Sequence, residues 1–211
     1  MRLLLVDNYD SFTFNLKHLI ECQNNVTLDI CRNDDNFLDD LKNNKYAGVF
    51  ISPGPGSPED KAYFGYNKEL ILDYGTKGLP ILGVCLGFQG IYHCFGGNLK
   101  LGEHPVHGKT SQLSIEKEGV ILKDVPEKTT VMRYHSILAD MTENTPEDLE
   151  ITAYAYNQNN TPDYSEPMAL EHKEFPIYGV QFHPESFATS SSALMIQNFL
   201  SVCRGKHKLI P

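Results

Sequence analysis

The stretch Leu79-Pro80-Ile81-Leu82-Gly83-Val84-Cys85-Leu86-Gly87 decides the fold of this chain. An apolar run leads into a cysteine flanked by glycines, and a helix-like stretch follows at once. Glycines in this pattern allow a strained strand-to-helix turn that holds the side chain between them out over a sheet. The backbone N–H of the next residue, Leu86, then faces a reacting carbonyl as half of an oxyanion hole. The pattern predicts that Cys85 is the nucleophile of an acyl-transfer reaction.

Apolar runs and helix-like stretches alternate along the first half of the chain and return near its end. Alternation of this length indicates a parallel sheet with helices on both faces. The functional site of such a sheet lies at the carboxyl ends of its strands, where Cys85 is expected. We expect strands near 3–6, 27–31, 47–51, 79–84 and 176–182, and helices near 11–21, 34–43, 66–74, 86–95 and 190–203.

The segment from about 97 to 169 has a different pattern. Short strand candidates near 130–134 and 150–156 are separated by turn-rich stretches, which is typical of antiparallel strands. We therefore predict an α/β fold with a mainly parallel central sheet, flanking helices and an appended antiparallel strand region. At 211 residues, we expect a single domain spanning 1–211.

A histidine and a carboxylate stand two positions apart in Gly179-Val180-Gln181-Phe182-His183-Pro184-Glu185. A thiol needs a base, and His183 can take its proton and return it to a leaving amine. Side chains two apart on an extended segment point the same way, so Glu185 can orient the imidazole. The alternative is a strand end with a capping acid, but the cysteine elbow favours the catalytic interpretation.

The loop Ser52-Pro53-Gly54-Pro55-Gly56-Ser57-Pro58 follows the third predicted strand. Its alternating prolines and glycines indicate a stiff backbone with accessible N–H groups. Such a loop at the carboxyl end of a strand can complete an oxyanion hole. A loop without a chemical role is the alternative from these residues alone.

Composition excludes several classes of function. The net charge of −9 argues against nucleic acid as a partner, because phosphate binding needs a basic face. No apolar stretch approaches the ~20 residues of a membrane span, and no signal peptide is visible. The five cysteines include no C-x-x-C pair and no zinc-like spacing. We therefore expect a cytoplasmic protein with reduced thiols, no membrane association and no metal site.

Five motifs in this chain resemble those of the class I (triad) glutamine amidotransferases. More narrowly, they resemble the small glutaminase subunits of anthranilate synthase and aminodeoxychorismate (para-aminobenzoate) synthase. The motifs follow the family order and span almost the whole chain. They are the segments 7–13 (DNYDSFT), 52–58 (SPGPGSP), 83–87 (GVCLG), 133–136 (RYHS) and 179–186 (GVQFHPES).

The resemblance implies a catalytic triad of Cys85, His183 and Glu185 that hydrolyses L-glutamine to glutamate and ammonia through a thioester. It implies delivery of ammonia to a separate large synthase subunit that aminates chorismate. It implies no cofactor in this chain, with magnesium belonging to the partner subunit. The residues implied to bind glutamine or its oxyanion are Gly54, Pro55, Gly56, Leu86, Gln89, Ser136 and Ile137.

The chain departs from the family at Phe88, where histidine is common. This position is not the triad base, so the change is expected to alter packing behind the elbow. The segment His104-Pro105-Val106-His107-Gly108-Lys109 is either near the subunit interface or a surface turn. A stand-alone cysteine hydrolase of related fold and a non-catalytic regulatory subunit remain as alternatives. The tryptophan and folate branches are not separated by these residues.

Overall fold

The computed structural model describes residues 1–142, 145–157 and 159–206, with the side chains of 103–106 and 206 left out of the description. Within these residues nine strands form one sheet in the order β2-β1-β3-β4-β9-β8-β7-β5-β6. The parallel strands are β2 (Thr27–Arg32), β1 (Arg2–Asp7), β3 (Val49–Ile51), β4 (Ile81–Val84) and β9 (Ile177–Val180). The antiparallel strands are β8 (Pro162–His172), β7 (Leu149–Tyr156), β5 (Leu99–Ile115) and β6 (Thr130–Ala139).

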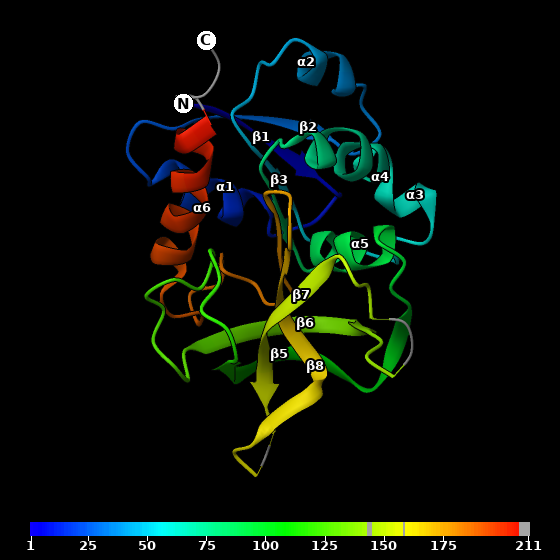
Figure 1. Cartoon of the computed structure of the whole chain (residues 1–211), viewed down its shortest axis with the longest axis vertical. Coiled ribbons are helices and arrows are strands. Elements are labelled where there is room, and N and C mark those ends of the chain that lie inside the picture. The colour runs from blue at the N-terminus through cyan, green and yellow to red at the C-terminus, as the bar shows by residue number, and fades with distance from the viewer. Residues whose placement is uncertain (143–144, 158, 207–211) are drawn as a thin grey trace.

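Helices cover both faces of the parallel half, as the apolar character of its strands requires (Figure 1). Successive side chains of β1 enter opposite cores, since Leu3 packs on one face and Leu4 on the other. The first core lies under α1 (Thr13–Glu21) and α6 (Ser192–Lys206). The second lies under α2 (Leu38–Lys42), α3 (Lys61–Phe64), α4 (Asn67–Glu69) and α5 (Leu86–Cys94).

The predicted fold class is confirmed, with corrections to individual elements. The helix expected at 34–43 is shorter, because residues 33–35 form turns before α2 begins at Leu38. The helix expected at 66–74 is broken into α4, a π-helical turn η1 (Leu70–Tyr74) and a 3₁₀ turn η2 (Gly75–Lys77). Helix α3 and the long strands β5 and β8 were not predicted.

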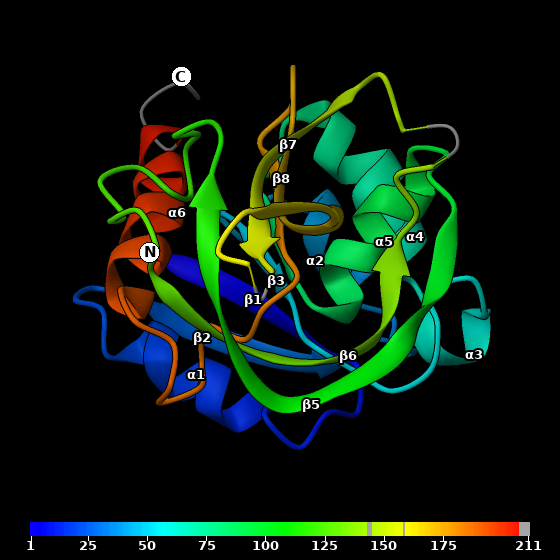
Figure 2. The same ribbon diagram turned by 90° about the horizontal axis from the view of Figure 1, so that it is seen from below.

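Strand β5 brings the antiparallel half under the site. It pairs first with β6 and then with β7, and irregularities between Leu101 and Val106 and between His107 and Lys109 bend it. Figure 2 shows β5 as a long curved band beneath the molecule. The surface-turn alternative for 104–109 is therefore wrong, because this segment lies within β5. The side chains of His104, Pro105 and Val106 lie outside the described residues, so the interface prediction for them stays untested.

Candidate active site

Cys85 occupies a strained turn between β4 and α5. Its φ of 53° and ψ of −98° fall outside the regions that a residue with a side chain ordinarily adopts. The turn is held because the Cys85 N–H donates to the Val180 carbonyl at 2.8 Å, while the Cys85 carbonyl accepts from the Gln89 N–H at 3.0 Å. As the N-cap of α5, Cys85 lies where unpaired N–H groups and the helix dipole favour a negative charge.

Gly83 allows this turn to be tight. A Cβ at Gly83 would lie 2.5 Å from the Gly87 carbonyl carbon, which is shorter than any real contact. We expect Gly83→Ala to push the start of α5 away from β4, lowering the free energy of unfolding by ~1–3 kcal/mol. Urea unfolding measures this change, and Gly205→Ala is the matched control because a Cβ there meets nothing within 4 Å. Equal stability of the two variants would contradict the close packing of the elbow.

His183 and Glu185 form a buried hydrogen-bonded pair just beyond β9. The His183 Nδ1–H donates to Glu185 Oε1 at 2.6 Å, and the two side chains are 3% and 1% exposed. The expected geometry was wrong in one respect, because β9 ends at Val180 and the pair lies on a turn. The Ser186 N–H closes that turn on the His183 carbonyl at 3.2 Å. The turn, rather than strand alternation, brings the two side chains together.

The electrostatic surroundings favour a charged imidazole at His183. Burial lowers the pKa of His183, but Cys85 and Glu185 together outweigh burial and hold this pKa well above its usual value. The Nε2 atom of His183 is buried and has no hydrogen-bond partner among the described residues. Because Cys85 is among the groups that raise this pKa and Nε2 is not hydrogen-bonded, Nε2 can exchange a proton with the thiol or with a substrate.

Two aromatic rings enclose His183. The Tyr134 ring lies 5.3 Å from the imidazole centroid and the Phe12 ring 6.1 Å from it, both edge-on. These two rings also stack on each other at 5.4 Å. The catalytic candidate is thus enclosed on this side by apolar surface, which strengthens electrostatic interactions within the site.

A pocket of about 500 Å³ opens beside Cys85 and contains most of the predicted substrate-binding residues. Pro55 is exposed and its side chain does not line the pocket. The Leu86 side chain is buried and packs against Gly54, leaving only its backbone to serve a ligand. The lining residues are Gly54, Gly56, Ser57, Cys85, Gln89, Leu101, His107, Tyr134, His135, Ser136 and Ile137.

Gln181 belongs to this site although the sequence did not single it out. Its Nε2 donates to Cys85 Sγ at 3.6 Å, and its Oε1 accepts from Gln89 Nε2 at 3.3 Å. Gln89 Nε2 also donates to the Ile137 carbonyl at 2.9 Å. A chain of amides therefore joins the nucleophile to the predicted substrate-binding backbone. The available signal was a polar amide inside the apolar run 179–182, since buried amides are seldom kept without partners.

Arg133 and His135 are buried next to each other, and His135 lines the pocket. Arg133 pairs with Glu166 and donates to Ser111 Oγ at 2.9 Å. Burial, followed by the charge of Arg133, lowers the pKa of His135 to about 3. His135 is therefore neutral at physiological pH and binds a proton only weakly, which favours His183 over it as the base of the site.

The depressed pKa of His135 predicts an acid-sensitive fold. An unfolded histidine takes up a proton as pH falls below about 6.5, whereas His135 in the folded state stays neutral down to about pH 3. The unfolded state then binds more protons, so stability falls with pH across this window by at most ~1.4 kcal/mol per unit. We expect His135→Gln to make that slope shallower in urea unfolding between pH 7 and 4.5. The exposed His18→Gln is the control, and equal slopes in both variants would contradict the prediction.

Phe88 lies inside α5 and is fully buried. A Cβ at Gly179 would lie 3.1 Å from its ring, so Phe88 packs directly against β9. The expectation that this departure affects packing behind the elbow is consistent with that position.

Two further observations concern cofactors and membranes. Among the described residues, no group of three or more His, Cys, Asp or Glu side chains is arranged to hold a metal ion. No helix in the described part of the chain combines the length and apolar character needed to cross a bilayer.

Comparison with known proteins identifies the family. The family model of class-I glutamine amidotransferases matches residues 4–203. The anthranilate synthase component 2 of Leptospira biflexa is 39% identical over 206 residues, covering 95% of this chain and 100% of that protein. The protein of the same name from Methanothermobacter thermautotrophicus is 40% identical over 203 residues, covering 94% and 97%.

Solved structures show the same similarity. A Thermoplasma acidophilum protein assigned to GMP synthase superposes with a TM-score of 0.82 at 25% identity, covering 99% of this chain and 96% of that one. Family match, sequence identity and fold agree over nearly the full length. This chain belongs to the class-I glutamine amidotransferases.

Proposed function

We propose that this chain is the glutaminase subunit of an anthranilate synthase, which hydrolyses L-glutamine and supplies ammonia to a large subunit that aminates chorismate. The observation that carries the proposal is the position of Cys85, on a strained elbow beside a pocket, together with its electrostatic interaction with the buried His183–Glu185 pair. The names of the relatives favour the anthranilate branch over the folate branch.

In the proposed reaction, the Cys85 thiolate attacks the side-chain amide carbon of glutamine. The carbonyl oxygen becomes an oxyanion, and the N–H of Leu86 and an N–H of the 54–56 loop stabilise it. Imidazolium His183 then donates its proton to the amide nitrogen, so that the C–N bond breaks and ammonia leaves. Water, deprotonated by His183, attacks the thioester, and glutamate departs as the thiolate is restored.

The remaining residues position the substrate and the base. Glu185 holds the imidazole through Nδ1 and stabilises its charged form. Gln89, Ser136 and Ile137 line the pocket, where their polar groups would hold the amino-acid end of glutamine. Gln181 would orient the thiol between turnovers. Magnesium, where the synthase reaction needs it, would belong to the large subunit.

The test is an assay of the native complex, captured through this chain and given glutamine, chorismate and magnesium. Fluorescent anthranilate together with glutamate is the expected result. Aminodeoxychorismate without anthranilate would overturn the branch but keep the glutaminase. Glutamate with neither product would identify a different synthase partner, and no glutamate at all would favour a non-catalytic subunit.

A further inference from the structure

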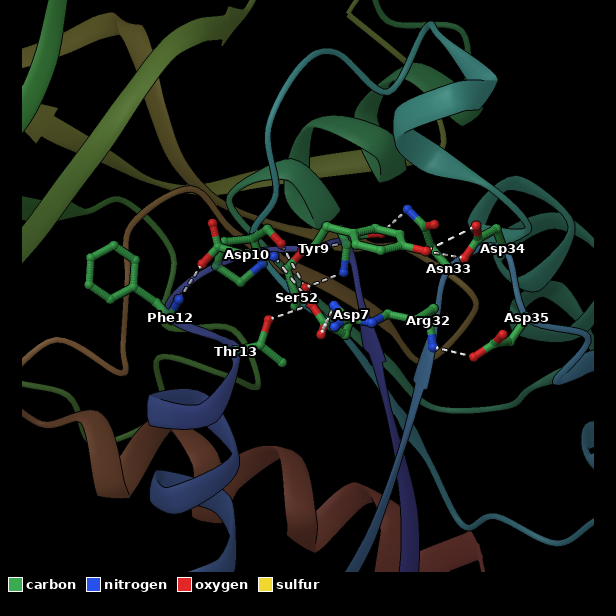
Figure 3. Close-up of polar contacts among 12 residues, drawn as sticks. Asp7, Tyr9, Asp10, Phe12, Thr13, Arg32, Asn33, Asp34, Asp35 and Ser52 are labelled. Atoms are coloured by element: carbon green, nitrogen blue, oxygen red, sulfur yellow. Dashed lines mark hydrogen bonds and ion pairs between the residues drawn. The ribbon is translucent and has the colours of Figure 1, made fainter.

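The segment 7–13 follows β1 and closes into a tight loop at the edge of the site. The buried carboxylate of Asp7 accepts from Thr13 Oγ1 at 2.8 Å and from the Asp10 N–H at 3.2 Å, and it pairs with Arg32 at 2.5 Å. Asp10 Oδ1 in turn accepts from the Phe12 N–H at 2.7 Å. Figure 3 shows these polar groups converging on the loop from β1 and β2.

Tyr9 gives this loop an unusual backbone. Its φ of 62° lies in the left-handed region, which a bulky residue seldom occupies unless its surroundings hold it there. The Tyr9 hydroxyl donates to Asp34 at 2.8 Å, and the Arg32 guanidinium lies 4.5 Å from the centre of its ring. Asn8 and Phe12 lie on either side of this turn in the sequence, and each contacts a different part of the site.

Asn8 supports the 53–56 loop. Its side chain is buried, and its Nδ2 donates to the Ser52 carbonyl at 2.7 Å. Its backbone N–H donates to Ser52 Oγ at 2.9 Å. A Cβ at Gly54 would lie 2.6 Å from Asn8 Cβ and 2.7 Å from Leu86 Cδ2, so Gly54 is fitted between Asn8 and the first residue of α5.

Asn8 is itself fixed from two other elements. Its Oδ1 accepts from Asn33 Nδ2 at 3.0 Å and from Asn67 Nδ2 at 2.7 Å. Asn33 continues from the end of β2 and Asn67 begins α4. Four segments of the chain therefore meet at one buried amide, whose donor and acceptor sides both have partners.

Phe12 contacts the other part of the site. Its ring packs edge-on against His183 and stacks on Tyr134. The Phe12 N–H donates to Asp10 Oδ1, and this hydrogen bond fixes the backbone position of Phe12. The charged or titratable groups that face His183 are Cys85 and Glu185, with Asp10 and His135 further contributors to the local field.

We propose that the segment 7–13 is a positioning element that fixes the oxyanion loop through Asn8 and the catalytic base through Phe12. This inference rests on the proposed function. Its physical basis is that an oxyanion donor acts only within about 2.7–3.1 Å, and displacement of a reacting group by ~1 Å can cost about 10²-fold in rate. One loop thereby sets the distance between the two halves of the reaction centre.

The Asn8 contact is tested with Asn8→Asp, which keeps the shape but replaces the donor to the Ser52 carbonyl with a carboxylate oxygen. We expect kcat for glutamine in the complex to fall by about 10²-fold. Iodoacetamide alkylation of Cys85 at pH 6 should keep its wild-type rate, because His183 is untouched. The exposed Asn36→Asp is the matched control and should leave both rates unchanged.

The alkylation rate also reports folding, because an unfolded variant loses the coupling of Cys85 to His183. Should Asn8→Asp fail to fold, Ser52→Ala is the second variant. It removes a hydroxyl that accepts the Asn8 N–H and donates to the Pro53 carbonyl at 2.6 Å, and a kcat about 10-fold lower is expected. The alkylation rate of the exposed Cys22, measured in the same sample, serves as the internal reference.

The Phe12 contact is tested with Phe12→Leu. We expect alkylation of Cys85 at pH 6 to slow by about 10-fold, and the pH profile of that reaction to approach the profile of Cys22. Phe14→Leu, the same change two residues on at a ring that is 64% exposed, should leave the profile unchanged.

Different outcomes separate the inference from the function on which it rests. If the wild-type complex is active and the Asn8 and Phe12 variants keep its kcat and alkylation profile, the positioning role alone is overturned. Loss of both readouts together in a folded Asn8→Asp variant would show one general disturbance instead of two separate contacts. A wild-type complex without glutaminase activity would overturn the proposed function first.

Discussion

Replacing Cys85 with serine is expected to abolish the use of glutamine by the complex, with a fall in kcat of roughly 10⁴-fold or more. The elbow would still hold a hydroxyl over the pocket, but a neutral serine is a far weaker nucleophile than a thiolate paired with an imidazolium. Synthesis by the same complex from added ammonium salt should continue at the wild-type rate, because ammonia enters the reaction after the step that needs Cys85.

The comparison of the two nitrogen sources is the measurement. Cys22→Ser, which changes an exposed thiol that does not line the pocket, is the matched control and should leave both rates unaltered. A Cys85→Ser complex that used glutamine normally would remove Cys85 from the role of nucleophile. Loss of the ammonia-dependent rate as well would indicate a damaged subunit contact instead.

The second large effect is expected at His183. We expect His183→Ala to lower kcat for glutamine by about 10³–10⁴-fold. The variant can neither donate a proton to the leaving nitrogen nor accept one from the attacking water. The raised pKa of His183 predicts a second readout, since the imidazolium no longer stabilises negative charge on Cys85. Alkylation of Cys85 at pH 6 should therefore slow in the variant and recover as pH rises.

Glu185→Gln gives the graded comparison for this prediction. It keeps a hydrogen bond to Nδ1 but removes the buried charge that helps to raise the pKa of His183. A loss smaller than that of His183→Ala is expected. An unchanged glutaminase rate in His183→Ala would exclude His183 as the base and indicate that another group around the pocket takes this role.

The sequence predicted the parallel half well because its signals are local. A strand buried on both faces is a continuous apolar run, and a nucleophile elbow needs glycines at fixed offsets from Cys85. Both requirements act within a few residues. The predicted pairing of His183 with Glu185 was found, although the turn that achieves it was not foreseen.

Other features depend on partners that are distant in sequence. Strand β5 is partly polar and irregular, and its course is set by pairing with β6 and β7. Gln181 became a site residue only when β9 was placed beside β4, which brings its amide to Cys85. Asn8 has no local signal for its four-way contact, since its partners come from residues 33, 52 and 67.

The central position of β9 has a consequence for synthesis of the chain on the ribosome. Strand β9 lies between β4 and β8, yet among the described residues it is the last strand in chain order. Until residues 177–185 have emerged and β9 has paired with β4, Cys85 lacks the contact from Gln181 and the nearby His183–Glu185 pair. The proposed glutaminase reaction therefore needs β9 in its place in the sheet. Joining strands so far apart in sequence is also a slow step of folding.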